Sequence, residues 1–491
     1  MKRILISLMM VAATVITAAA QDFPDIFSAF AKQANQEFAS FRDKANREYA
    51  DFMRKSWEWF EENDPVSPPV WEVPVVPPVT VSDEELNKER KGKEIPYAEV
   101  VPETQPSPAP RPIEPIEEVP VPIVRTAVFE LYGTQCSVRF DNENRPFIGK
   151  VTENAVADLW EAFTSYEGVD NMLYDLYGLR ESMQLCDWAY YKCVCAFCNA
   201  IYPDDGEEAG LLQAFIMTQS GFDLKIGFDQ SGHVYPLMAM ECALYDYPFF
   251  EVNGQQYYLL EKNSSESLKI LEDSFPARTN PMRVTMDHEN LFSESLSNVR
   301  SLKSKRYPEV SVSTASNINL IAFFDEYPLA FVNNDMKTKW RFYANVPASH
   351  NMRETIYPEL RRAVAGKTQL QAADILLNFV QTAFEYEYDE KVWGGDRSFF
   401  ADESIYYPYC DCEDRSILFS RLVRDILGLD VVLIYYPGHL ASAVNFTENV
   451  KGDYIIYCNS RYVVCDPTYI NAPVGMTMPD MDNSSAFVVV L

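Results

Sequence analysis

Three residues near the C-terminal end of the chain have the types and the order of a cysteine-dependent catalytic site. Cys412 opens a segment in which apolar residues recur every three to four positions, as in an amphipathic helix. His439 leads an apolar, strand-like run, and Asp466 precedes a proline after another such run. A thiol, an imidazole and a carboxylate in this order suit a nucleophile, a general base and the group that orients the base. We therefore predict a triad of Cys412, His439 and Asp466.

The helix expected to begin at Cys412 should favour the thiolate form of its side chain. Asp411 and Asp414 have the spacing of a capping box, which places Cys412 in the first helical turn. Free backbone N–H groups and the helix dipole act there on a negative charge. The sequence therefore predicts a lowered pKa for Cys412. Cys410 is the competing thiol, but it precedes the helix and lies outside this field.

The sequence around the three residues predicts the helices and strands that would position them. Apolar residues from Leu370 to Val380 predict a helix before the catalytic segment, and Gly428 ends the helix that starts at Cys412. The run 431–436 predicts a buried strand, followed after Pro437-Gly438 by the strand that His439 leads. A hairpin of 454–457 and 462–465 then leads to Asp466.

Three short motifs around these residues occur together in one known superfamily. They are Cys412-Glu-Asp-Arg-Ser before a leucine-rich helix, Gly438-His-Leu-Ala-Ser-Ala-Val, and Val464-Cys-Asp-Pro-Thr-Tyr. On these motifs the segment Gln369 to Leu491 resembles the bacterial transglutaminase-like cysteine peptidases. The resemblance implies an α+β, papain-like domain over 346–491 with the triad on Cys412, His439 and Asp466. The glycine usual two residues before the cysteine is Cys410 here.

The resemblance is less specific for the reaction, because the superfamily contains amide cross-linkers, deamidases, peptidases and inactive members. We expect a hydrolase, an amidase or peptidase acting on protein or peptide carboxamides, because no calcium-loop pattern is visible. A cross-linking transamidase is one alternative. A non-catalytic binding or scaffold protein is another, in which Cys412 is a structural thiol and His439 a core histidine. No cofactor or metal is expected.

The beginning of the chain has the pattern of a secretory signal. Lys2 and Arg3 precede an apolar run, and small residues end it near Ala20. Residues 1–20 are therefore predicted to be a signal peptide of a secreted or periplasmic protein with no later membrane span; the alternative is an uncleaved anchor. The formal net charge of −30 disfavours nucleic acid as a partner, because such a surface repels phosphate.

An eleven-residue repeat follows the signal. Phe27, Phe38, Tyr49 and Phe60 form one aromatic row, which predicts one long amphipathic helix over 21–63. Its aromatic stripe is expected to pack on the same chain, on a copy of itself or on a partner. Residues 64–125 hold many of the 31 prolines and are predicted to be an extended linker, a plain spacer rather than a ligand for a proline-reading domain.

A second repeat predicts that the catalytic module is duplicated. If Gly221 is laid on Gly428, the helix, the strands and the hairpin of 126–262 follow the plan of the C-terminal module. Asp205 then takes the place of Cys412, while His233 and Glu261 take those of His439 and Asp466. We therefore expect 126–262 to be a transglutaminase-like module without a nucleophile. The alternative is a chance likeness between two helix-strand-hairpin units.

Two further regions carry weaker patterns. Residues 263–345 alternate polar loops with short apolar runs, including 318–324 and 339–343, and predict a β-rich connecting region. Four cysteines cluster upstream of the first repeat unit, at positions 186, 193, 195 and 198. Cys193 and Cys195 would point to opposite sides of a helix, so buried thiols are a better interpretation than zinc ligands.

Overall fold

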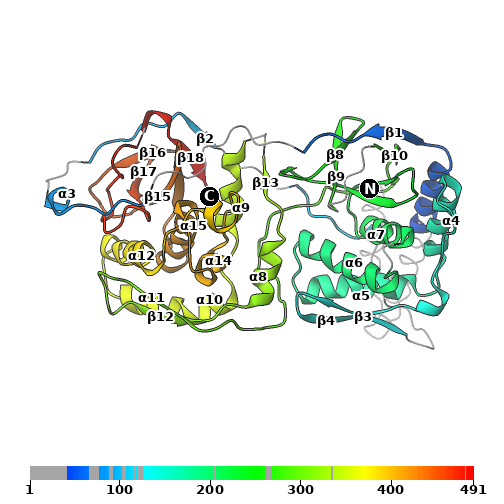
Figure 1. Cartoon of the computed structure of the whole chain (residues 1–491), viewed down its shortest axis with the longest axis horizontal. Coiled ribbons are helices and arrows are strands. Elements are labelled where there is room, and N and C mark those ends of the chain that lie inside the picture. Colours follow the sequence, from blue (N-terminus) through cyan, green and yellow to red (C-terminus); the bar gives the residue numbers. More distant parts are fainter. Residues whose placement is uncertain are drawn as a thin grey trace, which may run out of the picture.

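The chain folds into two lobes that lie side by side in one elongated body (Figure 1). The structure is a computed structural model that describes residues 41–65, 77–87, 92–101, 107–113, 118, 125–203, 206–260, 267–332, 335–481 and 483–491. Each lobe combines one six-stranded sheet with helices, so the predicted α+β class is confirmed. The predicted signal peptide, residues 1–20, lies outside the described residues.

The first lobe is built on a sheet of order β1-β10-β5-β6-β9-β8. Its strands are β1 Trp57–Glu61, β5 Leu224–Phe228, β6 Val234–Ala239, β8 Phe249–Val252, β9 Gln255–Leu259 and β10 Ser267–Leu271. Four helices pack with it: α4 Glu153–Thr164, α5 Val169–Ser182, α6 Asp187–Ile201 and α7 Glu207–Gln219. A separate hairpin, β3 Thr126–Leu131 and β4 Thr134–Arg139, covers α5 and α6. Cys186, Cys193 and Cys198 are buried at the start of α6 and along it.

The second lobe is built on a sheet of order β16-β17-β15-β14-β18-β2. Its strands are β2 Glu99–Val101, β14 Val431–Tyr436, β15 His439–Asn445, β16 Tyr454–Tyr457, β17 Ser460–Cys465 and β18 Phe487–Val490. The main helices are α9 Lys339–Asn345, α10 His350–Thr355, α11 Tyr357–Val364, α12 Gln369–Ala383, α14 Ala401–Tyr406 and α15 Cys412–Leu422. The predicted helix, strand and hairpin segments of this region are therefore present.

The two sheets have the same strand order. Read from the hairpin edge, β8-β9-β6-β5-β10-β1 corresponds strand by strand to β16-β17-β15-β14-β18-β2. Gly221 and Gly428 both follow the central helix and both have positive φ, 90° and 64°. The edge strands differ in direction, because β1 runs antiparallel to β10 whereas β2 runs parallel to β18. The strand order required by a duplication is therefore present in both lobes.

The predicted helix over 21–63 is wrong at its C-terminal end. Residues 41–53 are helical, but the chain turns at 54–56 and continues as β1, in which Trp57 pairs with Leu271. The alternation of tryptophan and glutamate in this stretch suits a strand at a sheet edge better than a helix. Residues 21–40 lie outside the described residues. The described helix packs on its own chain, since the Tyr49 ring contacts that of Trp160 at 5.1 Å.

The predicted plain spacer over 64–125 is also wrong in its described parts. Val81 donates to Ile470 O at 2.9 Å, Ile95 donates to Tyr454 O at 2.7 Å, and β2 extends the second sheet. The chain then returns to the first lobe, where Ile113 donates to Gln219 O at 3.1 Å. Prolines lack an N–H donor, but the residues between them keep theirs and use them for these contacts.

The predicted β-rich region 263–345 contains strands, but two of the apolar runs expected to form strands are helical instead. Residues 318–324 lie in α8, Ile318–Asp325, which Asn317 caps by accepting from Asn319 N–H, and 339–343 lie in α9. Short apolar runs do not distinguish a buried helix from a strand, which explains the error. Strands remain in the hairpin β11 Arg300–Lys303 and β12 Ser311–Thr314 and in the short β13 Ala330–Phe331; β10 belongs to the first sheet.

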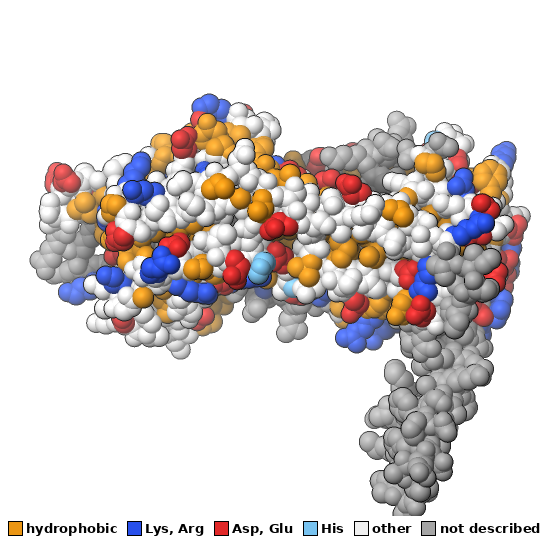
Figure 2. Space-filling model, turned by 90° about the horizontal axis from the view of Figure 1, so that it is seen from below, with side chains coloured by type: hydrophobic (Ala, Val, Ile, Leu, Met, Phe, Trp, Pro, Cys, Tyr) orange, Lys and Arg blue, Asp and Glu red, His pale blue; other side chains and the backbone are white. Residues whose placement is uncertain are grey.

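Among the described residues, no helix has both the length and the apolar character needed to cross a bilayer. The face seen in Figure 2 carries acidic and basic side chains interspersed with apolar ones, without a broad patch of one sign. No broad acidic surface is therefore visible on this face.

Candidate functional site

Cys412 is the first residue of α15, as predicted. The Asp411 carboxylate accepts hydrogen bonds from Glu413 N–H and Asp414 N–H, and Asp414 accepts one from Asp411 N–H at 3.2 Å. The predicted capping box is therefore confirmed. The helix continues as a π-helical turn to Leu427 and ends at Gly428 in the left-handed conformation. As the first helical residue, Cys412 carries a backbone N–H without an intrahelical acceptor.

Side-chain hydrogen bonds attach α15 to β15. Ser416 Oγ donates to Leu440 O at 2.9 Å, and Ser442 Oγ donates to Ser416 O at 3.4 Å. Closer to the start of the helix, Leu440 N–H donates to Cys412 Sγ at 3.5 Å. The thiol is therefore held against the residue that follows His439.

His439 and Asp466 form a buried pair. His439 Nε2 lies 2.9 Å from Asp466 Oδ2, and both side chains are almost completely excluded from solvent. The other ring nitrogen, Nδ1, is buried and makes no hydrogen bond within the described part of the chain. If Nε2 carries the proton that the carboxylate accepts, Nδ1 has a free lone pair and can accept a proton.

The carboxylate of Asp466 is fixed by its own loop. Asp466 Oδ1 accepts from Thr468 N–H at 2.9 Å and from Tyr469 N–H at 3.1 Å. The side-chain amide of Gln381, on α12, donates to the backbone oxygens of Asp466, Tyr469 and Ala472 at 2.8–3.0 Å. Asp466 therefore cannot turn away from His439 without breaking several hydrogen bonds.

The predicted low pKa of Cys412 is wrong for this conformation. The Cys412 side chain is fully buried, and burial together with the charges of Asp411 and Glu413 raises the pKa of its thiol well above the ordinary value. Helix-start placement stabilises a thiolate, but the loss of hydration in the interior outweighs it. Cys410 is likewise buried, and burial raises the pKa of its thiol.

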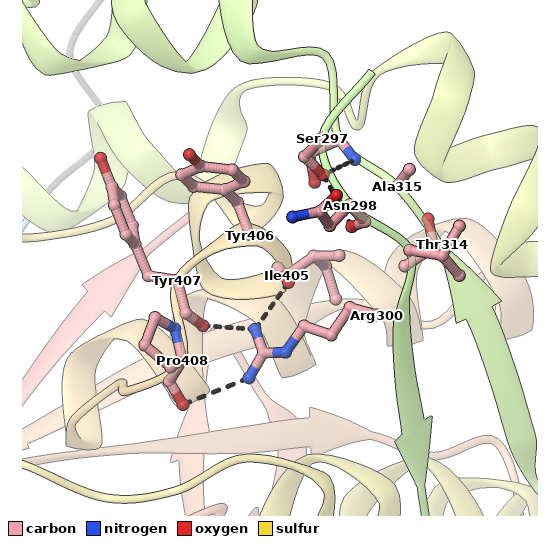
Figure 3. A pocket seen from close by; sticks show the side chains of 11 residues that line it. Ser297, Asn298, Arg300, Thr314, Ala315, Ile405, Tyr406, Tyr407 and Pro408 are labelled. Carbon is pink, nitrogen blue, oxygen red and sulfur yellow. Dashed lines mark hydrogen bonds between the residues drawn. The ribbon is translucent and has the colours of Figure 1, made fainter.

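An arginine on the β11–β12 hairpin holds the segment that precedes Cys412. The Arg300 guanidinium donates to the backbone oxygens of Ile405, Tyr407 and Pro408 at the end of α14 (Figure 3). These bonds satisfy helix-end carbonyl groups that would otherwise lack donors. Figure 3 also shows the neighbouring cavity of about 450 Å³, which Ser297, Asn298 and Tyr406 help to line. Arg300 thus positions the segment that precedes Cys412.

A buried lysine holds the carboxylates next to Cys412. Asp389, Asp396 and Glu413 bring one oxygen each within 4.8 Å of the others, a spacing that would suit a metal ion. The Lys339 ammonium already pairs with Asp396 and lies 3.6 Å from Glu413. Because this ammonium supplies the positive charge, we propose no metal there.

Two tyrosines lie beside the buried thiol. The Tyr386 and Tyr388 rings meet edge to face at 5.5 Å. Burial raises the pKa of both hydroxyls, and the charge that the nearby Cys412 thiol carries when ionised adds to this effect. Both tyrosines are partly exposed, whereas Cys412 is fully buried. Sequence patterns carried no signal for four residues around the site: Tyr388, Gln381, Arg300 and Lys339. Their roles arise from contacts distant in sequence, which no local pattern signals.

The first lobe places His233 at the register position of His439. In the second lobe, the β14–β15 pairing starts at Val431↔Val444 and reaches Tyr436↔His439 five pairs later. In the first lobe, the β5–β6 pairing starts at Leu224↔Met238, and five pairs later Asp229 lies opposite His233. The His233 side chain is 57% exposed and lies 3.5 Å from Asp229, so it lacks the buried setting of His439. Asp205 and Glu261, the other two predicted counterparts, lie outside the described residues.

The helix start in the first lobe has glycine in place of cysteine. The central helix contacts the histidine-bearing strand at a corresponding point in each lobe. In the first lobe Gly210 packs against Val234 O, and in the second lobe Ser416 Oγ donates a hydrogen bond to Leu440 O. Cys412 lies four residues before Ser416, and Gly206 lies four residues before Gly210. Gly206, which precedes α7, therefore corresponds to Cys412. The first lobe therefore has no thiol at this position.

Comparisons of the chain with protein-family models, with curated proteins and with solved structures gave no match.

Proposed function

We propose that the protein is a secreted or periplasmic, transglutaminase-like cysteine hydrolase that cleaves carboxamides of proteins or peptides. The observation that carries the proposal is the buried His439–Asp466 pair, with Nδ1 of His439 unpaired, beside a strand that holds the Cys412 thiol. A histidine oriented by a carboxylate and left with one free nitrogen is what thiol activation requires.

In the proposed reaction, His439 Nδ1 accepts the Cys412 proton and the thiolate attacks the carboxamide carbon. The N–H of Cys412 donates to the oxygen that becomes negative. His439 then returns the proton to the departing nitrogen, which leaves as ammonia or an amine, and a thioester remains. Water, deprotonated by His439, cleaves the thioester to a carboxylate and regenerates the thiol. Asp466 keeps the imidazole oriented throughout.

The buried thiol has a consequence for access. A substrate carbonyl reaches Cys412 only if neighbouring side chains move, because Cys412 is fully buried in this conformation. The raised thiol pKa belongs to the same closed state. Proton transfer to His439 produces an ion pair, which stabilises the thiolate once the site opens.

A thiol-labelling experiment tests the proposal on the folded chain. Iodoacetamide is added to the native protein, and each cysteine is followed by peptide mapping. Cys465 is the internal control, because it is equally buried and the pKa of its thiol is also raised by burial, but it is no candidate nucleophile. Cys412 should react faster than Cys465, and His439→Ala should abolish the difference. Cys410→Ala should preserve it.

The second candidate function is non-catalytic binding, which the complete burial of Cys412 favours. Release of ammonia or amine from a denatured protein separates the two candidates, since only an enzyme loses this release in Cys412→Ala. Incorporation of a labelled primary amine instead would identify the cross-linking transamidase. Equal labelling of Cys412 and Cys465 without any amide cleavage would reject the enzyme and favour the binding protein.

A further inference from the structure

A cavity lies in the first lobe, at the place that corresponds to the proposed catalytic centre of the second. It has a volume of about 880 Å³, and Gly206, Gly210 and His233 line it. These residues stand at the positions of Cys412, Ser416 and His439 in the matching hairpin and helix. Pockets of this size hold ligands of several residues. The first lobe thus keeps a cavity where it lacks a nucleophile.

The walls of the cavity are rich in aromatic side chains. Trp188 and Tyr191 come from α6, Tyr235 from β6, and the rest from connecting segments; the aromatic lining is Trp188, Tyr191, Tyr235, Tyr245, Tyr247 and Tyr327. Trp188 is 2% exposed, and its indole N–H makes no hydrogen bond within the described residues.

The charged groups of the cavity leave a negative excess. Glu326 is paired with Lys192 at 2.5 Å, and Asp325 is paired with Arg397. Asp246 also lines the cavity; it is exposed and has no ion-pair partner within the described residues. The site already holds one ammonium near an aromatic ring, because Lys192 Nζ lies 5.7 Å from the Trp188 ring centroid. Aromatic faces and a free carboxylate together favour a cationic group.

We propose that this cavity binds a peptide segment that carries a basic side chain, with its ammonium or guanidinium at Asp246 among the tyrosine rings. Binding at this site does not depend on the proposed chemistry at Cys412. The cavity wall does contact the catalytic segment, since Asp325 accepts a hydrogen bond from Tyr407 O–H at 2.7 Å. A peptide substrate of the second lobe is therefore a suitable source of the bound segment.

Calorimetric titration of the full chain tests the proposal. The probe is the N-terminally acetylated peptide Gly-Gly-Lys-Gly-Gly amide, compared with the same peptide acetylated also on its lysine side chain and with maltohexaose as a neutral sugar. We expect the lysine peptide to bind, the lysine-acetylated peptide to bind about fivefold more weakly or not at all, and binding to weaken in high salt. Asp246→Asn should weaken the lysine peptide about fivefold, and Tyr247→Ala about threefold.

Two control variants separate this site from the catalytic one. Asp430→Asn removes an exposed carboxylate from the second lobe, and Cys412→Ala removes the candidate nucleophile; both should leave peptide affinity unchanged. Unchanged affinity in Asp246→Asn, equal binding of the lysine-acetylated peptide, or no binding of the lysine peptide up to about 5 mM would overturn the proposal. Binding of maltohexaose alone would also overturn it. If Cys412 reacts with iodoacetamide no faster than Cys465 while the lysine peptide still binds, only the enzyme proposal is rejected and the binding proposal stands.

Discussion

Gly210 on α7 packs directly against Val234 O on β6, at the cavity of the first lobe. A Cβ atom added at Gly210 would lie 2.3 Å from Val234 O, so the helix can sit this close only because residue 210 has no side chain. In the second lobe Ser416 occupies the corresponding place and donates its hydroxyl to Leu440 O. The helix therefore meets the strand through a backbone van der Waals contact in the first lobe and through a side-chain hydrogen bond in the second.

Replacing Gly210 by alanine should destabilise the protein, although alanine is the better helix former. The overlap with a backbone oxygen forces α7 off β6, and we expect a loss of more than about 2 kcal/mol in the free energy of unfolding. Gly178→Ala in α5 is the matched control, because its Cβ would meet nothing within 4 Å. That variant should gain up to about 1 kcal/mol. Urea denaturation of both variants measures the two changes, and equal effects would contradict the close crossing.

Replacing Gln381 by leucine should loosen the loop that holds Asp466. The substitution keeps the volume but leaves three backbone oxygens without their donor, at an expected cost of about 3 kcal/mol. The labelling advantage of Cys412 over Cys465 should fall with it, because the orientation of His439 depends on Asp466. Gln135→Leu on the exposed side of β4 should change neither property. A labelling rate that stays at the wild-type value would remove Gln381 from the positioning residues.

Replacing Arg300 by lysine should release the segment before Cys412. A lysine cannot reach Ile405 O, Tyr407 O and Pro408 O together, because it lacks the planar fork of arginine. Hydrogen exchange of residues 405–411 should accelerate, with a loss of about 1–2 kcal/mol in stability. Lys303→Ala, at an exposed position on the same strand, is the control and should leave exchange unchanged. If hydrogen exchange of residues 405–411 is unchanged in Arg300→Lys, the three hydrogen bonds of Arg300 are not needed to hold this segment.

Buried carboxyl groups should make the protein less stable as the pH rises from about 4 to 7. Burial raises the pKa of Asp402 from its ordinary 3.8 to about 6, so the native state holds this proton more tightly than the unfolded state. The contribution is complete below about pH 4 and is lost as the pH passes through 6, a change of about 2 kcal/mol for this group.

Unfolding free energies measured at several pH values check this expectation. Asp402→Asn carries no titrating group and should flatten the decline between about pH 4 and 6, even if it lowers stability throughout. Asp83→Asn, on the exposed helix α3 Asp83–Asn87, should keep the wild-type slope. Stability that increases over this pH range in the wild type would contradict the assignment.

The sequence alone was sufficient for much of the second lobe. The helix-start signal at Asp411 and Cys412, the glycine that ends the helix, and the alternation of strand and turn residues all act within a few positions. Such local preferences remain visible in the sequence, which is why the strands from 431 to 465 were predicted with nearly their observed bounds. The register of His233 with His439 was also anticipated from the repeat.

Tertiary structure decided the properties that depend on distant partners. The burial of Cys412, and with it the raised pKa of the thiol, comes from surroundings that no spacing in the sequence reveals. Pairing with β10 made Trp57–Glu61 a strand and not the end of a helix, and pairing with β18 drew part of the proline-rich segment into the second sheet. Strand pairing and desolvation are contributed by residues far apart in the chain, so a local pattern cannot determine them.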